Sequence, residues 1–489
     1  MFQSAEQPHE ISKFDFKQQE AALREALLEA QFDLVERQAF PLLILLAGLD
    51  GAGKGAVLAR LGAWLDPHHL HIVAFDRPTD VEKARPRMWR YWYNLPPRGK
   101  LGVFVGSWYR EPLAAHVIGK RDENALVREL AAINRFEQML AEEGVLLLKF
   151  WLHLSGGESK RRLREIAREE GVRHVVEQRG WKQTRSEIVT VGERIAMDTS
   201  TGLAPWVVVP SDNAYYRDLS VGRTILEAVR KRLAAAPVPA TPSAPAPIPP
   251  LDGRTVLDGL DLESSLSPTD YRRQLAELQQ RLGRMTDDRR FRKVGVVAVF
   301  EGNDAAGKGG SIRRVTMSID PRRVRVHSIA APTDEEKAQP YLWRFWRRLP
   351  GRGHVAVFDR SWYGRVLVER IEGFCADRDW LRAYGEINDF EADLTAHGLV
   401  IVKFWLAISK DEQLRRFKER ENTPFKRYKI TDEDWRNREK WDAYALAVND
   451  MVDRTSTEHA PWTLVEAEDK RYARVKVLST VCDRLEGVL

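Results

Sequence analysis

The sequence lacks the features that are typical of secreted proteins, of proteins stabilised by zinc and of membrane proteins. Its 2 cysteines, Cys375 and Cys482, are far apart and have no CxxC spacing or neighbouring histidines. A disulfide framework and a zinc site are therefore not expected. No apolar run approaches the roughly 18 residues that a membrane span requires, and the segment after Met1 has neither a basic nor an apolar leader pattern. We expect a cytoplasmic protein without a membrane partner.

Signals of nucleic-acid binding are also missing. The chain has no basic tail, no helix-turn-helix pattern and no aromatic RNA-binding motif. Its net charge of +6 is mild, and it permits an anionic partner without identifying one. A nucleic-acid-binding regulator with a nucleotide sensor therefore remains the weaker hypothesis, and no nucleic-acid partner is expected.

What the chain does contain is a long internal repeat. Both halves carry an apolar run followed by the spacing GxxxxGK, and Lys308 lies 254 residues after Lys54. The same offset holds without a gap between Pro78-Thr79-Asp80 and Pro332-Thr333-Asp334, between Ser107-Trp108-Tyr109 and Ser361-Trp362-Tyr363, and between Lys149–Leu152 and Lys403–Leu406. So many identities indicate a duplicated domain.

The 489 residues, 43% of them hydrophobic, are enough for two domains with separate cores. We expect a first domain over 1–235, a proline-rich linker over 236–262 and a second domain over 263–489. Each copy alternates apolar strands with helical stretches, which is typical of an α/β fold with a parallel sheet. In the second copy the expected strands are 294–300, 324–329, 355–358, 400–405 and 462–466.

The glycine-rich stretch of the second copy predicts a phosphate-binding loop between a buried strand and a helix. The loop amides and small residues expected to surround phosphate are Gly302, Asn303, Ala306, Gly307, Gly309 and Gly310, together with Lys308. Gly309 stands where this motif usually has a Ser or Thr that holds Mg²⁺. Asp304 would repel phosphate unless a metal ion or a proton lay between them, so we predict a metal-binding or catalytic role for it. A glycine-rich turn without a ligand is the alternative.

Several charges occur only in the second copy. Asp359 and Arg360 follow the strand 355–358, where a second Mg²⁺ ligand and a phosphate-binding cation are expected, and Arg365 is a second such cation. The first copy has Val105 and Gly106 at the positions of Asp359 and Arg360. The stretch 412–429 predicts a basic lid containing Arg416 and Arg420. A solvated, salt-bridged surface helix is the alternative.

The first copy also lacks other cations of the second. It has Ala59, His68, His69 and His71 where the second copy has Arg313, Arg322, Arg323 and Arg325, and Ile166 and Val172 in place of Arg420 and Lys426. We therefore expect the first copy to be catalytically degenerate and the second to be active.

Together these residues resemble polyphosphate kinase family 2 in its two-domain form. The resemblance covers nearly the whole chain outside the linker, and it rests on Gly302–Gly310, Asp359–Tyr363, Lys403–Leu406 with Ser409-Lys410, and Ala460-Pro461-Trp462. It implies two tandem P-loop kinase-like domains, each a parallel sheet flanked by helices with a helical lid. The implied reaction transfers the terminal phosphoryl group of inorganic polyphosphate to AMP, giving ADP, in the second copy with Mg²⁺, and the family also accepts Mn²⁺.

The resemblance also implies roles for single residues. Asp304 and Asp359 would organise the metal ion and the acceptor, and Arg360, Arg416 and Arg420 would spread the charge of the transition state. The path of the polyanion would be lined by Arg313, Arg314, Arg322, Arg323, Lys418 and Lys426. A homo-oligomer is compatible with this assignment. The alternatives are an ATP-dependent nucleoside monophosphate kinase and a polyphosphate kinase that acts on nucleoside diphosphates.

Overall fold

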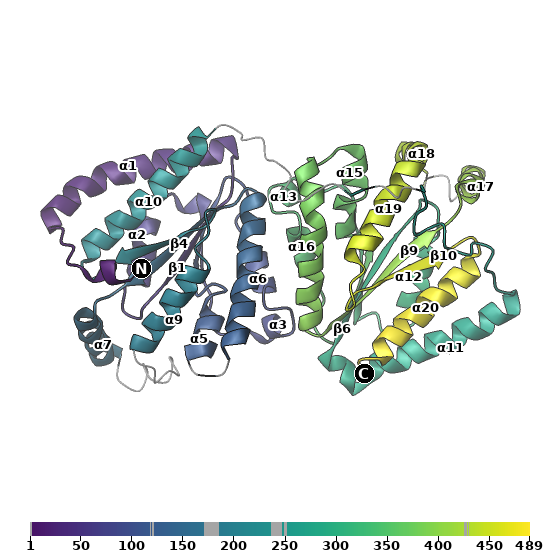
Figure 1. Ribbon diagram of the computed structural model, residues 1–489, viewed down its shortest axis with the longest axis horizontal. Helices are drawn as coiled ribbons and strands as arrows, with labels where there is room; N and C mark the ends of the chain where they lie inside the picture. Colours follow the sequence, from purple (N-terminus) through teal and green to yellow (C-terminus); the bar gives the residue numbers. More distant parts are fainter. Residues whose placement is uncertain are drawn as a thin grey trace. The chain divides into compact units, whose positions relative to one another are not determined.

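The computed structural model describes residues 2–117, 119, 122–170, 185–235, 247–248, 252–424, 428 and 430–489. The chain forms two compact units (Figure 1). The first unit consists of Met1–Pro78, Arg90–Val238 and Pro332–Arg344, and the second of Thr79–Trp89, Pro239–Ala331 and Phe345–Leu489. None of the helices in the described ranges combines the length and apolar character that crossing a membrane requires.

The first unit contains a five-stranded parallel sheet in the order β2-β3-β1-β4-β5. Figure 1 shows α1, α2 and α10 on one face of this sheet and α5, α6 and α9 on the other. The strands are β1 (Leu42–Gly48), β2 (Leu70–Ala74), β3 (Leu101–Val105), β4 (Leu146–His153) and β5 (Trp206–Pro210). The helices are η1 (Gln3–Glu6), α1 (Lys13–Arg37), α2 (Lys54–Trp64), η2 (Pro67–His69), α4 (Trp89–Tyr93), α5 (Arg110–Val117), α6 (Glu123–Glu142), α7 (Gly156–Glu170), α9 (Arg185–Asp198), α10 (Ala214–Ala234) and α13 (Asp334–Lys337).

The second unit repeats this sheet in the order β10-β9-β6-β8-β7, again with parallel neighbours. Its strands are β6 (Gly295–Gly302), β7 (Val324–Ser328), β8 (Val355–Asp359), β9 (Leu399–Ala407) and β10 (Trp462–Glu466). Its helices are α3 (Asp80–Lys83), α11 (Pro268–Asp287), η3 (Arg289–Lys293), α12 (Lys308–Thr316), η4 (Trp362–Arg365), α15 (Val368–Glu372), α16 (Asp377–Ala396), α17 (Lys410–Glu421), α18 (Asp432–Glu439), α19 (Trp441–Thr455) and α20 (Lys470–Glu486), and α14 covers Trp343–Trp346. The predicted fold class is confirmed in both units.

Local sequence explains where these elements begin. Ser267 caps α11 by accepting a hydrogen bond from the Asp270 N–H, and Pro268 occupies the first helical position, which needs no N–H partner. The central strand β6 is apolar from Val296 to Phe300 and buried on both faces, because helices cover both sides of the sheet. Of the predicted linker, residues 247–248 and 252–262 are described, and they belong to the second unit.

Each unit contains the same buried polar network. In the second unit the Lys403 ammonium contacts the Glu391 carboxylate at 2.7 Å, and Tyr363 and Trp362 donate to the other oxygen of Glu391 at 2.7 and 3.1 Å. Lys403 also donates to the Thr455 carbonyl at 2.7 Å. The equivalent pair in the first unit, Lys149 and Glu137, lies 2.6 Å apart and is equally buried. The shared Ser-Trp-Tyr and Lys-Phe-Trp-Leu motifs therefore maintain the fold.

Candidate active site

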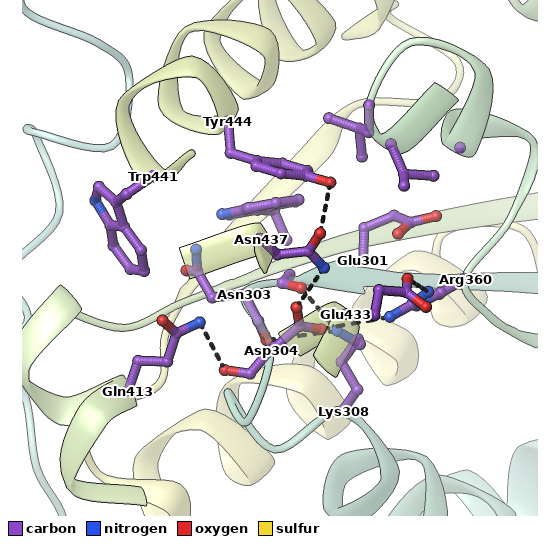
Figure 2. Close-up of a pocket in the computed structure, with 15 residues that line it drawn as sticks. Glu301, Asn303, Asp304, Lys308, Arg360, Gln413, Glu433, Asn437, Trp441 and Tyr444 are labelled. Carbon is purple, nitrogen blue, oxygen red and sulfur yellow. Dashed lines mark hydrogen bonds and ion pairs between the residues drawn. The ribbon is translucent and has the colours of Figure 1, made fainter. Parts of the chain in front are cut away.

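A cavity lies at the carboxyl ends of the central strands of the second unit, where β6 runs into the glycine-rich loop (Figure 2). Polar side chains from this loop, from Arg360 after β8, and from α17 and α18 line one part of it. Apolar and aromatic side chains line the rest, namely Leu367, Val368, Trp405, Trp441 and Tyr444. In a parallel sheet this edge is where ligands bind, so the cavity is the candidate active site.

The loop needs unusual backbone conformations. Gly302 has φ +148°, and a Cβ atom there would lie 2.5 Å from the Leu406 carbonyl oxygen. Gly307 has φ +109° and precedes the first residue of α12. Ala305 is held at φ +66°, where the first unit has Gly51 at φ +77°. Only glycine adopts these angles without strain, so the glycines of the motif are required by the turn itself.

Lys308 points into the cavity but is bonded to its own loop. Its ammonium donates to the carbonyls of Gly302 at 2.7 Å and Asn303 at 3.4 Å. Lys54 makes the same contacts in the first unit, at 2.9 Å to both Gly48 and Leu49. The lysine is thus placed to exchange these carbonyls for phosphate oxygens, and its position alone does not distinguish the two units.

Asp304 lies at the centre of the polar part, and Figure 2 shows its contacts. One carboxylate oxygen is 3.4 Å from Arg360 Nη2, and the other accepts a hydrogen bond from Asn437 Nδ2 at 2.8 Å. Arg360 Nη1 also contacts Glu433 at 3.2 Å. Burial would lower the pKa of Arg360, but the carboxylates of Asp304, Glu433 and Glu301 outweigh it and raise the pKa above its usual value. Arg360 is therefore a permanent cation beside Asp304.

Glu301 is a site residue that the sequence analysis missed. It is the only acidic residue of β6, it is buried, and it accepts a hydrogen bond from Ser361 Oγ at 2.8 Å. Burial raises the pKa of Glu301, and the Ser361 hydrogen bond and the cations Lys308 and Arg360 oppose that rise. The first copy has Ala47 at this position.

The offset comparison could also have revealed other missed residues. Side chains that line the cavity in the second unit have different counterparts in the first copy. At the 254-residue offset Gln413 aligns with Ser159, Glu433 with Arg179 and Asn437 with Gln183. At the offset of 256 that relates Thr455 to Thr199, Trp441 aligns with Arg185 and Tyr444 with Ile188. Each of these differences is a signal available from the sequence alone.

Asp359 is not among the residues that line the cavity. Asp359 ends β8 in register with Phe300 of β6, and Arg360 follows it with φ +63°. Its charge contributes to raising the pKa of Glu301, behind burial. No group of three or more His, Cys, Asp or Glu side chains among the described residues could hold a metal ion. Mg²⁺ usually binds through one or two carboxylates plus substrate phosphates, so Asp304 and Asp359 still fit such an ion.

Arg416 is almost fully buried and bonds to backbone carbonyls. Its Nη1 donates to Ala305 and Ala306 at 3.0 Å, and its Nη2 donates to Ala467 and Glu468 at 2.8 Å. Its Nε contacts Glu412 at 2.5 Å. Arg162 makes the equivalent contacts in the first unit, including a bond to the Gly51 carbonyl at 3.0 Å. In this state Arg416 holds the loop, and phosphate binding by it stays a prediction.

The other predicted phosphate-binding residues lie around the cavity without lining it. Arg365 pairs with Glu369 at 3.2 Å, and Arg420 lies close enough to Asp434 to influence its pKa. Lys418 is exposed on α17, and Lys426 lies outside the described residues. The loop residues Ala306, Gly307, Gly309 and Gly310 belong to the turn and to the first turn of α12.

The arginines predicted for the polyanion path are spread over several elements. Arg313 is exposed on α12, and Arg314 donates to the Gly310 carbonyl at 3.1 Å. Arg322 pairs with Asp320, and Arg323 contacts Thr286 and Asp287. Neither Arg322 nor Arg323 lines the cavity that contains Asp304.

In the first unit the tryptophan equivalent to Trp405 is covered by Phe2. Phe2 is 2% exposed and stacks on Trp151, with ring centroids 5.1 Å apart. Trp151 is the counterpart of Trp405, which lines the cavity of the second unit. Phe2 also lies 5.0 Å from the His153 ring. In the second unit Val256 takes the equivalent place in the chain, since its N–H donates to Asn449 as the Phe2 N–H donates to Glu193.

Comparison with known proteins gives consistent results. Residues 10–237 and 265–488 each match the family model described as polyphosphate kinase 2. The chain is 54% identical to the polyphosphate:AMP phosphotransferase of Pseudomonas aeruginosa, over 100% of this chain and 99% of that protein. It is 37% identical to the enzyme of the same name from Acinetobacter johnsonii, over 94% of this chain and 95% of that protein. A crystal structure described as a polyphosphate kinase 2 from Pseudomonas aeruginosa superposes with a TM-score of 0.90 at 52% identity, covering 100% of this chain and 99% of that one.

Proposed function

The chain belongs to the polyphosphate kinase 2 family, and from this premise we propose that its second unit transfers the terminal phosphoryl group of inorganic polyphosphate to AMP, forming ADP. The observation that carries the proposal is the cavity in which Lys308, Asp304 and Arg360 converge. The first copy lacks the counterparts of Arg360 and Glu301, and Phe2 lies against its equivalent aromatic wall. The names of the relatives support the same donor and acceptor.

The mechanism follows from the charges that the reaction brings together. The phosphate of AMP is already ionised, so the attacking oxygen needs orientation and charge neutralisation more than a general base. Lys308 would leave the Gly302 and Asn303 carbonyls to hold the reacting phosphates, and the loop amides would hold the rest. Arg360 would neutralise charge that develops in transfer, because its pKa keeps it cationic. Arg420 and Lys418 on α17 would approach the polyanion from the lid side.

Mg²⁺ or Mn²⁺ would supply further charge neutralisation between donor and acceptor phosphates. Asp304 and Asp359 would hold this ion, and Glu301 would help to orient the groups around it through Ser361. Asn437 would keep the Asp304 carboxylate oriented, since it donates to one of its oxygens at 2.8 Å. A cytoplasmic location and a homo-oligomer stay predictions.

The test is ADP formation by the full-length protein with AMP and Mg²⁺, comparing long-chain polyphosphate with ATP as donor. ADP from polyphosphate alone is expected. Turnover with ATP but not with polyphosphate would indicate an ATP-dependent nucleoside monophosphate kinase instead. A third arm supplies ADP as acceptor, because a relative from Ruegeria pomeroyi, 36% identical over 48% of this chain and 82% of that protein, is named NDP-polyphosphate phosphotransferase. ATP formation exceeding ADP formation would favour that alternative.

The repeat provides a matched pair of variants that assigns the active unit. Lys308→Ala is expected to remove most turnover, whereas Lys54→Ala is expected to leave it largely intact. The two lysines make the same loop contacts, so a difference between the variants cannot come from the loop fold alone. Steady-state ADP formation measures both. Loss of activity in a folded Lys54→Ala protein would show that the first unit also works.

The aromatic part of the cavity is where we place the nucleoside of AMP. Trp441→Ala is expected to raise the KM for AMP roughly 10-fold, since stacking on an aromatic side chain contributes about 1–3 kcal/mol per base. The KM for polyphosphate should not change, because Trp441 lies on the apolar side, away from Lys308. Trp441→Phe is the control and should restore most of the affinity. A KM for AMP that is unaffected by Trp441→Ala would show that the base of AMP does not stack on Trp441.

A further inference from the structure

A second cavity of the second unit, of about 670 Å³, has a markedly basic lining. Six arginines and two histidines line it, against one acidic residue, Asp80. The exposed Arg322 lies in the turn before β7, the edge strand of the sheet, and the exposed Arg325 is the second residue of β7. Arg352 comes from the turn before β8. Asp80 pairs with Lys83 at 3.0 Å and Arg322 pairs with Asp320 at 2.5 Å, so each of the two adds less than a full charge to the lining. A lining with this charge balance fits an anion that carries several charges.

This cavity is distinct from the candidate active site. It is lined by His354, Val355 and Ala356 at the amino end of β8, whereas Arg360 follows the carboxyl end of the same strand. Five residue steps of about 3.3 Å separate Val355 from Arg360, so the two sites lie roughly 16 Å apart along β8. A short phosphate ligand in the active site cannot reach the second cavity, but a long chain can.

Five of the eight basic lining residues occur only in the second copy, whereas Arg352 and His354 have the cations Arg98 and Lys100 as counterparts and Arg85 belongs to the first repeat. At the 254-residue offset the first copy has His68 and His71 in place of Arg322 and Arg325. It has Tyr93 and Asn94 in place of Arg347 and Arg348, and Val73 in place of His327. The five residues that differ are therefore dispensable for the fold that both copies share. They occur in the unit to which we assign catalysis.

His327 is influenced by the charges of two of the arginines that line the cavity. This half-buried histidine lies in β7 and lines the cavity. Burial lowers the pKa of His327, and the charges of Arg348 and Arg325 lower it further. A hydrogen bond with the Arg348 backbone opposes this, but the two guanidinium groups, which come from different elements, are close enough to disfavour a positive charge on His327. An anion bound there would relieve that repulsion.

We propose that this basic cavity is a second binding site for the polyphosphate chain, one that holds a distal part of a long donor while its end reacts beside Lys308. The proposal rests on the function proposed above. In this proposal Arg322 contacts the polyanion at the basic cavity and not at the active-site cavity. Arg325, Arg348 and Arg352 contact it there as well. Tethering a long chain at a second point lowers its apparent KM, because the reacting end is then held at a high effective concentration.

The test compares donors of two lengths in the Arg322→Ala/Arg325→Ala variant. Both side chains are exposed, so the fold should tolerate the change. We expect the KM for long-chain polyphosphate to rise roughly 10-fold at low salt, the scale of two lost exposed charge contacts. The KM for tripolyphosphate and the KM for AMP should stay unchanged, because tripolyphosphate cannot span the two sites. The salt dependence of long-chain binding should become less steep, by about one unit of log–log slope per lost contact.

The control variant Arg272→Ala/Arg273→Ala removes the same charge from exposed positions on α11 and should change neither KM. An equal rise in KM for both donor lengths, or no rise for the long donor, would overturn the proposal. Direct binding of labelled long-chain polyphosphate to wild type and variant gives a readout that does not need turnover. Weaker binding of RNA to the variant, with unchanged polyphosphate binding, would make the cavity a nucleic-acid site and equally overturn it. Absence of any ADP from polyphosphate in the wild type, by contrast, is the failure of the proposed function.

Discussion

Asp304→Asn is expected to lower kcat with polyphosphate and AMP at least ~100-fold, the scale of a lost charge-stabilising group in an active site. The substitution preserves the shape of the side chain and removes its charge. It therefore weakens the attraction to Arg360 at 3.4 Å and removes one of the two carboxylates that we propose as metal ligands. The measurement is the initial rate of ADP formation at saturating concentrations of both substrates.

The controls for this prediction come from the same chain. Asp50 is the counterpart of Asp304 in the first copy, and Asp50→Asn is expected to leave the rate near that of the wild type. Asp359→Asn is expected to lose activity on the same scale as Asp304→Asn if Asp359 binds the metal ion. Near-normal turnover in either variant of the second unit would remove that residue from the catalytic group.

Lys403→Met is expected to destabilise the second unit by about 3–5 kcal/mol, the cost of leaving one partner of a buried ion pair without its counterion. Glu391 would then keep two neutral donors, Trp362 and Tyr363, but would lose the ammonium at 2.7 Å. Burial already raises the pKa of Glu391, so the uncompensated carboxyl group should become protonated more readily. Chemical denaturation, followed by residual AMP-dependent turnover, reports on this unit without requiring the whole chain to unfold in one step.

The double variant Lys403→Met/Glu391→Leu separates pair loss from packing. Replacing both charges by apolar groups of similar volume is often close to neutral, so the double variant should recover much of the lost stability. Lys149→Met breaks the equivalent pair in the first unit and should leave the turnover-detected transition nearly unchanged. A double variant as unstable as Lys403→Met alone would show that the network acts through its hydrogen bonds and shape.

The sequence predicted the fold because the decisive patterns are local or repeated. The apolar run of β6, the GxxxxGK turn and the caps of α11 each depend on neighbouring residues, and the duplication provides every motif twice. The convergence of Lys308, Asp304 and Arg360 followed from topology, since parallel strands bring their carboxyl ends to one edge.

The remaining contributions to the site depend on tertiary packing. Asn437 and Trp441 lie well over a hundred residues after the loop, and nothing in their local sequence indicates that α18 and the start of α19 face Asp304. Arg416 is the opposite case, because its local sequence suggested a role in the site and its contacts could not be predicted. Its position on a basic helix suggested a phosphate ligand, but the sequence could not show that carbonyls of the loop and of Ala467 and Glu468 occupy its donors.

The tryptophans of the cavity have a spectroscopic consequence. Trp441 is partly exposed in the cavity wall, and Trp405 lies beside it, whereas most of the 15 tryptophans of the chain are buried in its cores. Indole emission responds to the polarity of its surroundings and to ring stacking. Occupation of the cavity would therefore change the ultraviolet fluorescence of the unlabelled protein, so the site contains its own optical reporter of ligand binding.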